Sequence, residues 1–137
     1  MLTQPLLDKL SKLHLSGFRA ALEEQLHNPQ YTELSFEERL GLLVDIETTR
    51  RANNSLRRRI QAARFPIAAT IEDLDLSARR GLNRGQVLQL AQSEWVDRHL
   101  NLMILGATGA GKTYLASALG RAACQAGCKV RYERTSR

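Results

Sequence analysis

The chain has 137 residues, of which 43% are hydrophobic and 25% charged, a composition typical of a folded globular protein rather than a disordered or fibrous one. Its 20 Lys and Arg residues outnumber 14 Asp and Glu, and the net charge of +6 is compatible with a polyanionic partner. No apolar run approaches the ~20 residues of a membrane span, and Cys124 and Cys128 have no companions at metal-site spacing. We therefore expect a cytoplasmic protein with reduced cysteines and no membrane partner.

Two short amphipathic helices are predicted between Leu2 and Leu26. The apolar face of the first consists of Leu6, Leu10 and Leu13, and that of the second of Phe18, Leu22 and Leu26. Asn28 and Pro29 end the second helix, because proline cannot continue it.

A much longer helix is predicted from Phe36 to Ala63. Ser35 and Glu38 form a capping box at its start, in which each side chain meets the other's backbone N–H. Its expected apolar stripe is Phe36, Leu40, Leu43, Leu56, Ile60 and Ala63. Phe65-Pro66 ends it.

The C-terminal half of this helix is rich in arginine, and no acid occurs from Thr48 to Ile71. The six arginines of this basic tract are Arg50, Arg51, Arg57, Arg58, Arg59 and Arg64. A solvated helix end matched to the helix dipole is one interpretation. The second interpretation is that the tract contacts DNA backbone phosphates without sequence preference. Six arginines without compensating acids favour this second interpretation.

Residues 66–82 are expected to connect two regions, and Asn83 to cap a short helix that carries Val87 and Leu88. The predicted organisation is a helical DNA- or partner-binding domain at residues 1–65, the connector at 66–82, and the start of an α/β domain at 83–137.

The most informative stretch lies in that last region. Leu102–Leu105 reads as a buried parallel strand, and Gly106–Thr113 follows it with the pattern G-x-x-x-x-G-K-[ST] at every fixed position. Leu115, Leu119, Ala122 and Ala126 then recur at helical spacing. A strand, a glycine-rich loop and a helix in this order predict a phosphate-binding loop, or P-loop.

Each residue type in the loop suits phosphate binding. Backbone N–H groups must converge on the phosphate oxygens, which the glycines and the free N–H groups of the following helix permit. Lys112 can reach the β- and γ-phosphates, and the Thr113 hydroxyl can coordinate Mg²⁺. Tyr114 argues against a dinucleotide-binding loop, which needs a small residue there. The predicted ATP-contacting residues are Gly106, Ala107, Thr108, Gly109, Ala110, Gly111, Lys112, Thr113 and Tyr114.

Gly127 is expected to end the P-loop helix, and Lys129–Tyr132 to form a second strand. The result would be a right-handed strand–helix–strand unit, the beginning of a P-loop fold. Glu133 is the one acid that follows Gly111, so no catalytic residue is assigned and ATP turnover is not expected.

Several segments together resemble the IstB-like ATP-binding proteins, which are transposition helpers of bacterial insertion sequences related to the DnaC helicase loaders among AAA+ ATPases. These segments are LSFEERLGLLVD (Leu34–Asp45), the arginine-rich helix end, Ile71–Asp75, Arg80-Gly81-Leu82, and NLMILGATGAGKT. The resemblance implies an α-helical N-terminal domain followed by the start of an α/β AAA+ domain. It also implies an oligomeric ATP- and DNA-binding protein that assists a transposase.

Family members continue with a Walker B acidic pair, sensor residues and an arginine finger, which cannot be placed in this chain. We therefore expect a truncated copy. Two alternatives are a helical interaction module with a vestigial P-loop and a small P-loop kinase. The 105 residues before Gly106 argue against the kinase.

Overall fold

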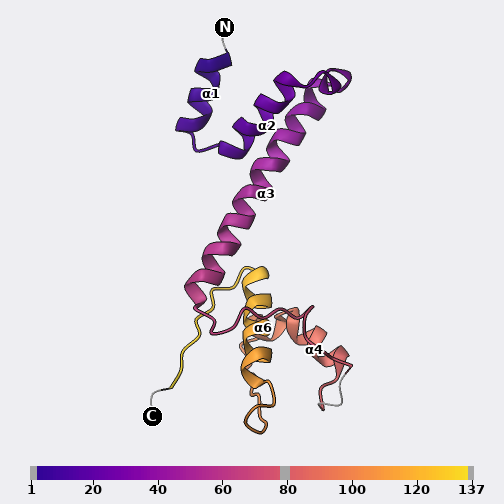
Figure 1. Ribbon diagram of the computed structural model, residues 1–137, viewed down its shortest axis with the longest axis vertical. Helices are drawn as coiled ribbons and strands as arrows, with labels where there is room; N and C mark the ends of the chain where they lie inside the picture. The colour runs from indigo at the N-terminus through magenta and orange to yellow at the C-terminus, as the bar shows by residue number, and fades with distance from the viewer. Residues whose placement is uncertain (1–2, 78–80, 136–137) are drawn as a thin grey trace. The chain divides into compact units, whose positions relative to one another are not determined.

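The computed structural model describes residues 3–77 and 81–135. Two compact units divide the chain, Met1–Ser55 and Leu56–Arg137. The division falls inside the longest helix, α3 (Phe36–Ala63), whose two ends therefore belong to different units. Figure 1 shows the helices of each unit along the chain.

The first unit is entirely helical among its described residues. Helix α1 (Thr3–Lys12) packs against α2 (Ser16–His27), and the short 3₁₀ helix η1 (Pro29–Glu33) leads into α3. Asn28 separates α2 from η1 and accepts a hydrogen bond from the Gln30 backbone N–H at 3.0 Å. The predicted helices are confirmed, because apolar spacing and the Asn28-Pro29 stop are local features that the sequence displays directly.

The faces that these helices bury differ from the predicted stripes. Leu7 and Leu10 are the buried residues of α1, whereas Leu6 and Leu13 are exposed. Helix α2 buries Ala21 and Gln25, and Leu26 is exposed. The prediction is confirmed for Leu10 and wrong for Leu6, Leu13 and Leu26, because a small helical hairpin leaves many large leucines at the surface.

Helix α3 begins and ends where the sequence predicted. Its capping box is formed in both directions: the Ser35 N–H donates to the Glu38 carboxylate at 2.8 Å, and the Glu38 N–H donates to the Ser35 hydroxyl at 3.2 Å. Leu43 and Ala63 are buried as expected, but Phe36 is 77% exposed and Leu40 is 38% exposed, so the predicted stripe is wrong at these two positions.

The second unit is built around α6 (Lys112–Gln125). This helix buries seven residues on more than one face, among them Leu115, Leu119 and Cys124. Helix α4 (Arg84–Ala91), which Asn83 caps through a 3.2 Å bond to the Gln86 N–H, contributes Val87 to the same core, and α5 (Glu94–Asp97) follows. The connector is part of this core, since Ile71, Leu74, Leu76 and Leu82 pack against it.

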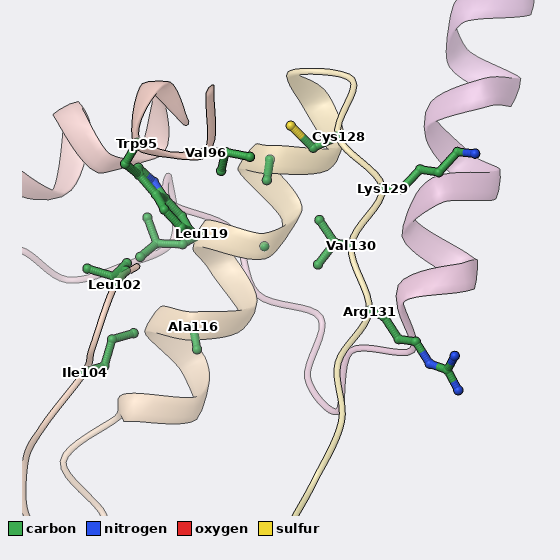
Figure 2. Close-up of a pocket in the computed structure, with 12 residues that line it drawn as sticks. Trp95, Val96, Leu102, Ile104, Ala116, Leu119, Cys128, Lys129, Val130 and Arg131 are labelled. Carbon is green, nitrogen blue, oxygen red and sulfur yellow. The ribbon is translucent and has the colours of Figure 1, made fainter. Parts of the chain in front are cut away.

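Both predicted strands are absent from the described residues. Residues 101–105 and 128–133 are extended, and their side chains alternate between exposed and partly buried, but neither segment has a strand partner there. The Tyr132 N–H instead donates to the Ala63 carbonyl at the end of α3, at 2.8 Å. Figure 2 shows that Leu102 and Ile104 lie on one side of α6, while Lys129, Val130 and Arg131 lie on the other.

A groove of about 440 Å³ separates the two extended segments and is floored by Ala116, Leu119 and Ala123 of α6. A strand satisfies its backbone only by pairing with a neighbour, and parallel strands are normally paired and covered on both faces. Because these segments lie apart, the sequence pattern of a strand is present without the sheet. The predicted α/β start is therefore present as loop and helix only.

Candidate functional site

The predicted P-loop lies between the first extended segment and α6. The Ala110 N–H donates to the Ala107 carbonyl at 3.1 Å, which forms a turn, and α6 begins at Lys112 directly after it. Gly109 and Gly111 have φ of 81° and 96°, a region that side-chain-bearing residues rarely adopt. Gly106 does not have a positive φ.

The Lys112 ammonium lies across the loop. Its Nζ donates to the Gly106 carbonyl at 2.6 Å and to the Ala107 carbonyl at 2.8 Å. Phosphate oxygens would compete with these two carbonyls for the same charged donor, and charged oxygens make the stronger acceptors. Thr113 is exposed in the first turn of α6.

A cavity of about 300 Å³ adjoins the loop. Its wall includes Gly106, Ala107, Ala110, Gly111 and Lys112 of the predicted site. Thr108, Gly109, Thr113 and Tyr114 are not part of that wall. The connector adds Leu74 and Leu82, which the sequence did not assign to the site. Only their packing against the core cluster that contains Leu115 could have revealed them.

No carboxylate lines this cavity among the described residues. The one acid after the loop, Glu133, pairs with Arg131 at 2.9 Å, and both side chains are exposed. No cluster of three or more potential metal-binding side chains occurs within residues 3–77 and 81–135. The predicted P-loop therefore has no carboxylate beside it in the cavity wall that the described residues form.

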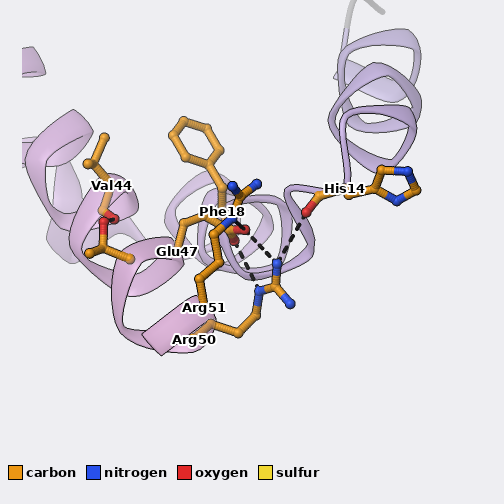
Figure 3. A network of polar contacts seen from close by, with 7 residues as sticks. His14, Phe18, Val44, Glu47, Arg50 and Arg51 are labelled. Atoms are coloured by element: carbon orange, nitrogen blue, oxygen red, sulfur yellow. Dashed lines mark hydrogen bonds and ion pairs between the residues drawn. The ribbon is translucent and has the colours of Figure 1, made fainter. Parts of the chain in front are cut away.

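The basic tract of α3 divides into structural and exposed arginines. Glu47 lies just before the tract and is 6% exposed. Its carboxylate accepts bonds from Arg50 at 2.6 Å and Arg51 at 3.0 Å, and from the Phe18 backbone N–H at 3.0 Å (Figure 3). Arg50 also donates to the His14 carbonyl at 3.1 Å, as Figure 3 shows. The assumption that all six arginines lack a compensating acid is thus wrong for Arg50 and Arg51.

The hydrogen bonds that Arg50, Arg51 and the Phe18 N–H donate to Glu47, here called the Glu47 network, shift the pKa values of its charged groups. The hydrogen bond from Arg50 is the largest influence and lowers the pKa of the Glu47 carboxyl from 4.5 to about 2, with further contributions from Arg51 and the Phe18 N–H that outweigh the opposing effect of burial. The same contact raises the pKa of Arg50. A carboxylate held in its charged form by two guanidinium groups joins α2 to α3 in the first unit.

Arg59 has a structural contact in the second unit. Its Nε donates to the Cys124 carbonyl in the last turn of α6, at 3.0 Å. The Cys124 thiol beside it is buried, and burial raises its pKa. Arg57, Arg58 and Arg64 are exposed. DNA contact by any of the six arginines remains a prediction, and these three are best placed for it.

No helix within the described residues is both long and apolar enough to cross a bilayer. Both cysteines are free thiols.

A glycine-rich loop that matches the P-loop pattern and opens a helix is typical of nucleotide-binding proteins, and sequence comparison points to the same class. Residues 8–137 match the family described as IstB-like ATP binding protein. This match covers almost the whole chain. The chain belongs to the IstB-like ATP-binding protein family.

Its relatives are proteins of insertion sequences. The predicted ATP-binding protein of insertion sequence IS1162 from Pseudomonas fluorescens is 43% identical over 138 residues, which cover 100% of this chain and 60% of the relative. A predicted insertion-sequence ATP-binding protein of Sinorhizobium fredii is 39% identical over 137 residues, 100% of this chain and 56% of the relative. A Mycobacterium tuberculosis relative is 35% identical over 128 residues, covering 93% and 51%. The chain therefore spans little more than half the length of these relatives.

Proposed function

We propose that the chain is an ATP-binding transposition helper, which holds the phosphates of ATP in the loop Gly106–Thr113 and contacts DNA while it assists a transposase. Family membership supports ATP binding and the link to insertion sequences. The observation that carries the proposal for this chain is the loop itself, with its two positive-φ glycines and an ammonium group positioned over the cavity wall. Such a helper would act in the cytoplasm. Its full-length relatives would form homo-oligomers.

Mg²⁺ fits the site through Thr113. Its hydroxyl is exposed in the first turn of the helix that follows the loop, and Mg²⁺ in nucleotide sites commonly takes few protein ligands together with substrate phosphates. When bound, the ion would neutralise phosphate charge. Because no described carboxylate lines the cavity, we propose that this chain binds ATP without hydrolysing it.

The decisive experiment measures ATP affinity by calorimetry for the wild type and Lys112→Ala. Loss of a charge-assisted hydrogen bond costs about 1.5–3 kcal/mol, so affinity should fall roughly ten- to a hundredfold. Lys129→Ala removes an equal charge from an exposed position outside the loop cavity and should leave ATP affinity unchanged. Equal affinity in the wild type and Lys112→Ala would instead support an interaction module with an inactive loop.

The proposed DNA contact is tested separately. Each phosphate contact contributes about −0.9 to the slope of log affinity against log salt. The double variant Arg57→Gln/Arg58→Gln should flatten this slope by up to about two units. Arg84→Gln, an exposed arginine at the start of α4, serves as the matched control. An unchanged slope in the double variant would identify the tract as a solvated helix end.

A further inference from the structure

The second unit contains another cavity, of about 240 Å³, at the C-terminal end of α3. The lining includes Gln61 from the last turn of α3, Arg64, Phe65 and Ile67 from the segment that follows, and Arg121 from α6. It is separate from the cavity beside the P-loop, since the two share no lining residue.

The polar side chains of this cavity are rich in hydrogen-bond donors. Arg64 and Arg121 supply guanidinium groups and Gln61 supplies an amide, and no carboxylate lines the cavity among the described residues. The Arg121 Nε is buried and has no hydrogen-bond partner in the part of the chain that the structure describes. Buried polar groups are nearly always hydrogen-bonded, so the Arg121 guanidinium, which belongs to a residue lining the cavity, has donor capacity that the described residues do not satisfy.

Two further features favour an oxyanion as the acceptor for this group. Guanidinium groups match phosphate oxygens in geometry as well as charge. Arg64 also lies seven residues after Arg57 on the same chain segment, about 10 Å at helical rise. This is close to the axial length of three nucleotides of one DNA strand. A polymer with several phosphates can therefore reach both places.

We propose that this cavity is a subsite for a backbone phosphate of nucleic acid, held jointly by Arg64 and Arg121. The inference rests on the DNA contact proposed above and adds Arg121, a residue outside the basic tract, to it. Free inorganic phosphate shares the same chemistry, and the experiment distinguishes the two sources.

The test measures DNA affinity as a function of salt for Arg64→Gln, Arg121→Gln and the double variant, with Arg84→Gln as the control. Each single variant should bind DNA about tenfold more weakly and lose about 0.9 from the salt slope. The double variant should lose no more slope than either single variant, because both side chains contact one phosphate. Arg121→Lys, which restores the charge, should recover most of the slope. Circular dichroism checks that each variant keeps its helix content. Because Arg64 is exposed, Arg64→Gln should leave the core of the second unit intact.

Wild-type slopes in folded Arg64→Gln and Arg121→Gln would overturn the proposal, as would an equal loss in Arg84→Gln. If these variants lose calorimetric binding of inorganic phosphate but keep DNA binding, the cavity takes free phosphate and the assignment to nucleic acid is wrong. If only Arg57→Gln/Arg58→Gln weakens DNA binding, the proposed subsite is wrong, while the proposed DNA contact by the basic tract is supported. A wild-type chain that binds ATP but not DNA would overturn both.

Discussion

The two units of this chain satisfy their backbones in different ways. In the first unit, described from Thr3 to Ser55, helices and a 3₁₀ turn hydrogen-bond almost entirely within themselves, and the Glu47 network joins α2 to α3. In the second, α6 is equally regular, but the extended segments beside it have no strand neighbour among the described residues.

Helices and strands differ in how far along the chain their hydrogen-bond partners lie. A helix closes its hydrogen bonds within a few residues, so it forms wherever periodicity and caps allow. A strand must hydrogen-bond to another strand, which comes from elsewhere in the chain. The same residues that predict a strand therefore produce an extended segment with exposed apolar side chains, such as Met103 at 78% and Leu105 at 84%.

The largest expected difference is in amide hydrogen exchange. The amides of Met103 and Leu105 lack strand partners in the described chain, whereas the Leu119 amide lies inside α6. Unpaired amides should exchange at least about a thousandfold faster than those of α6, because opening a packed helix costs several kcal/mol. Exchange followed by NMR measures this, and equal protection of both sets would show that the extended segment is paired in solution.

The next largest effect is expected in the first unit from Glu47→Ala. The substitution leaves two guanidinium groups and the Phe18 N–H without their shared acceptor, so Tm should fall by at least about 5 °C. Thermal unfolding followed by far-UV circular dichroism measures it. Glu37→Ala removes an exposed acid from the first turn of the same helix and should cost much less. Similar losses in both variants would mean that the network adds no stability.

Packing in the second unit is tested by Gly120→Ala. A Cβ there would lie 2.5 Å from Cε1 of Phe65, so the ring must move. Overpacking costs about 1–3 kcal/mol and the gain in helix propensity returns up to ~1, which leaves a net loss of about 1 kcal/mol. The single tryptophan, Trp95, reports unfolding of this unit by fluorescence. An unchanged midpoint in denaturant would indicate that Phe65 can move without cost.

Gly41→Ala is the counterpart in the first unit. Gly41 lies within α3 and a Cβ there would meet nothing within 4 Å. The variant should be more stable by about 0.5–1 kcal/mol through helix propensity alone. Urea unfolding measures the difference, and a loss of stability would show that this face of α3 is packed against something in solution.

The smallest expected effect is on the pH dependence of the free energy of unfolding. Because the pKa of Glu47 is lowered from 4.5 to about 2, its contribution to stability is fully present above about pH 4.5 and is lost as the pH falls toward about 2. Wild-type stability should therefore decline more steeply over this range than that of Glu47→Gln. Denaturation at several acidic pH values gives both curves, and parallel curves would contradict the lowered pKa.

Local features account for what could be predicted. The bounds of α3, the Ser35–Glu38 cap, the Asn83 cap and the start of α6 at Lys112 each depend on residues within four positions of one another. The glycine-rich loop is equally local, and its chemistry follows from residue type and spacing. For these features the linear order of residues already contains the relevant neighbours.

Only the tertiary structure decided the roles of residues whose partners are distant in sequence. Arg59 bonds a carbonyl 65 positions away, and Phe18 meets Glu47 across 29 positions. Arg121 and Arg64 line one cavity, although they are far apart in the sequence. Residue type and spacing determined the helices and the loop, because those depend on near neighbours. Folding alone brings distant side chains together, and so it decided which arginines became structural and which stayed exposed.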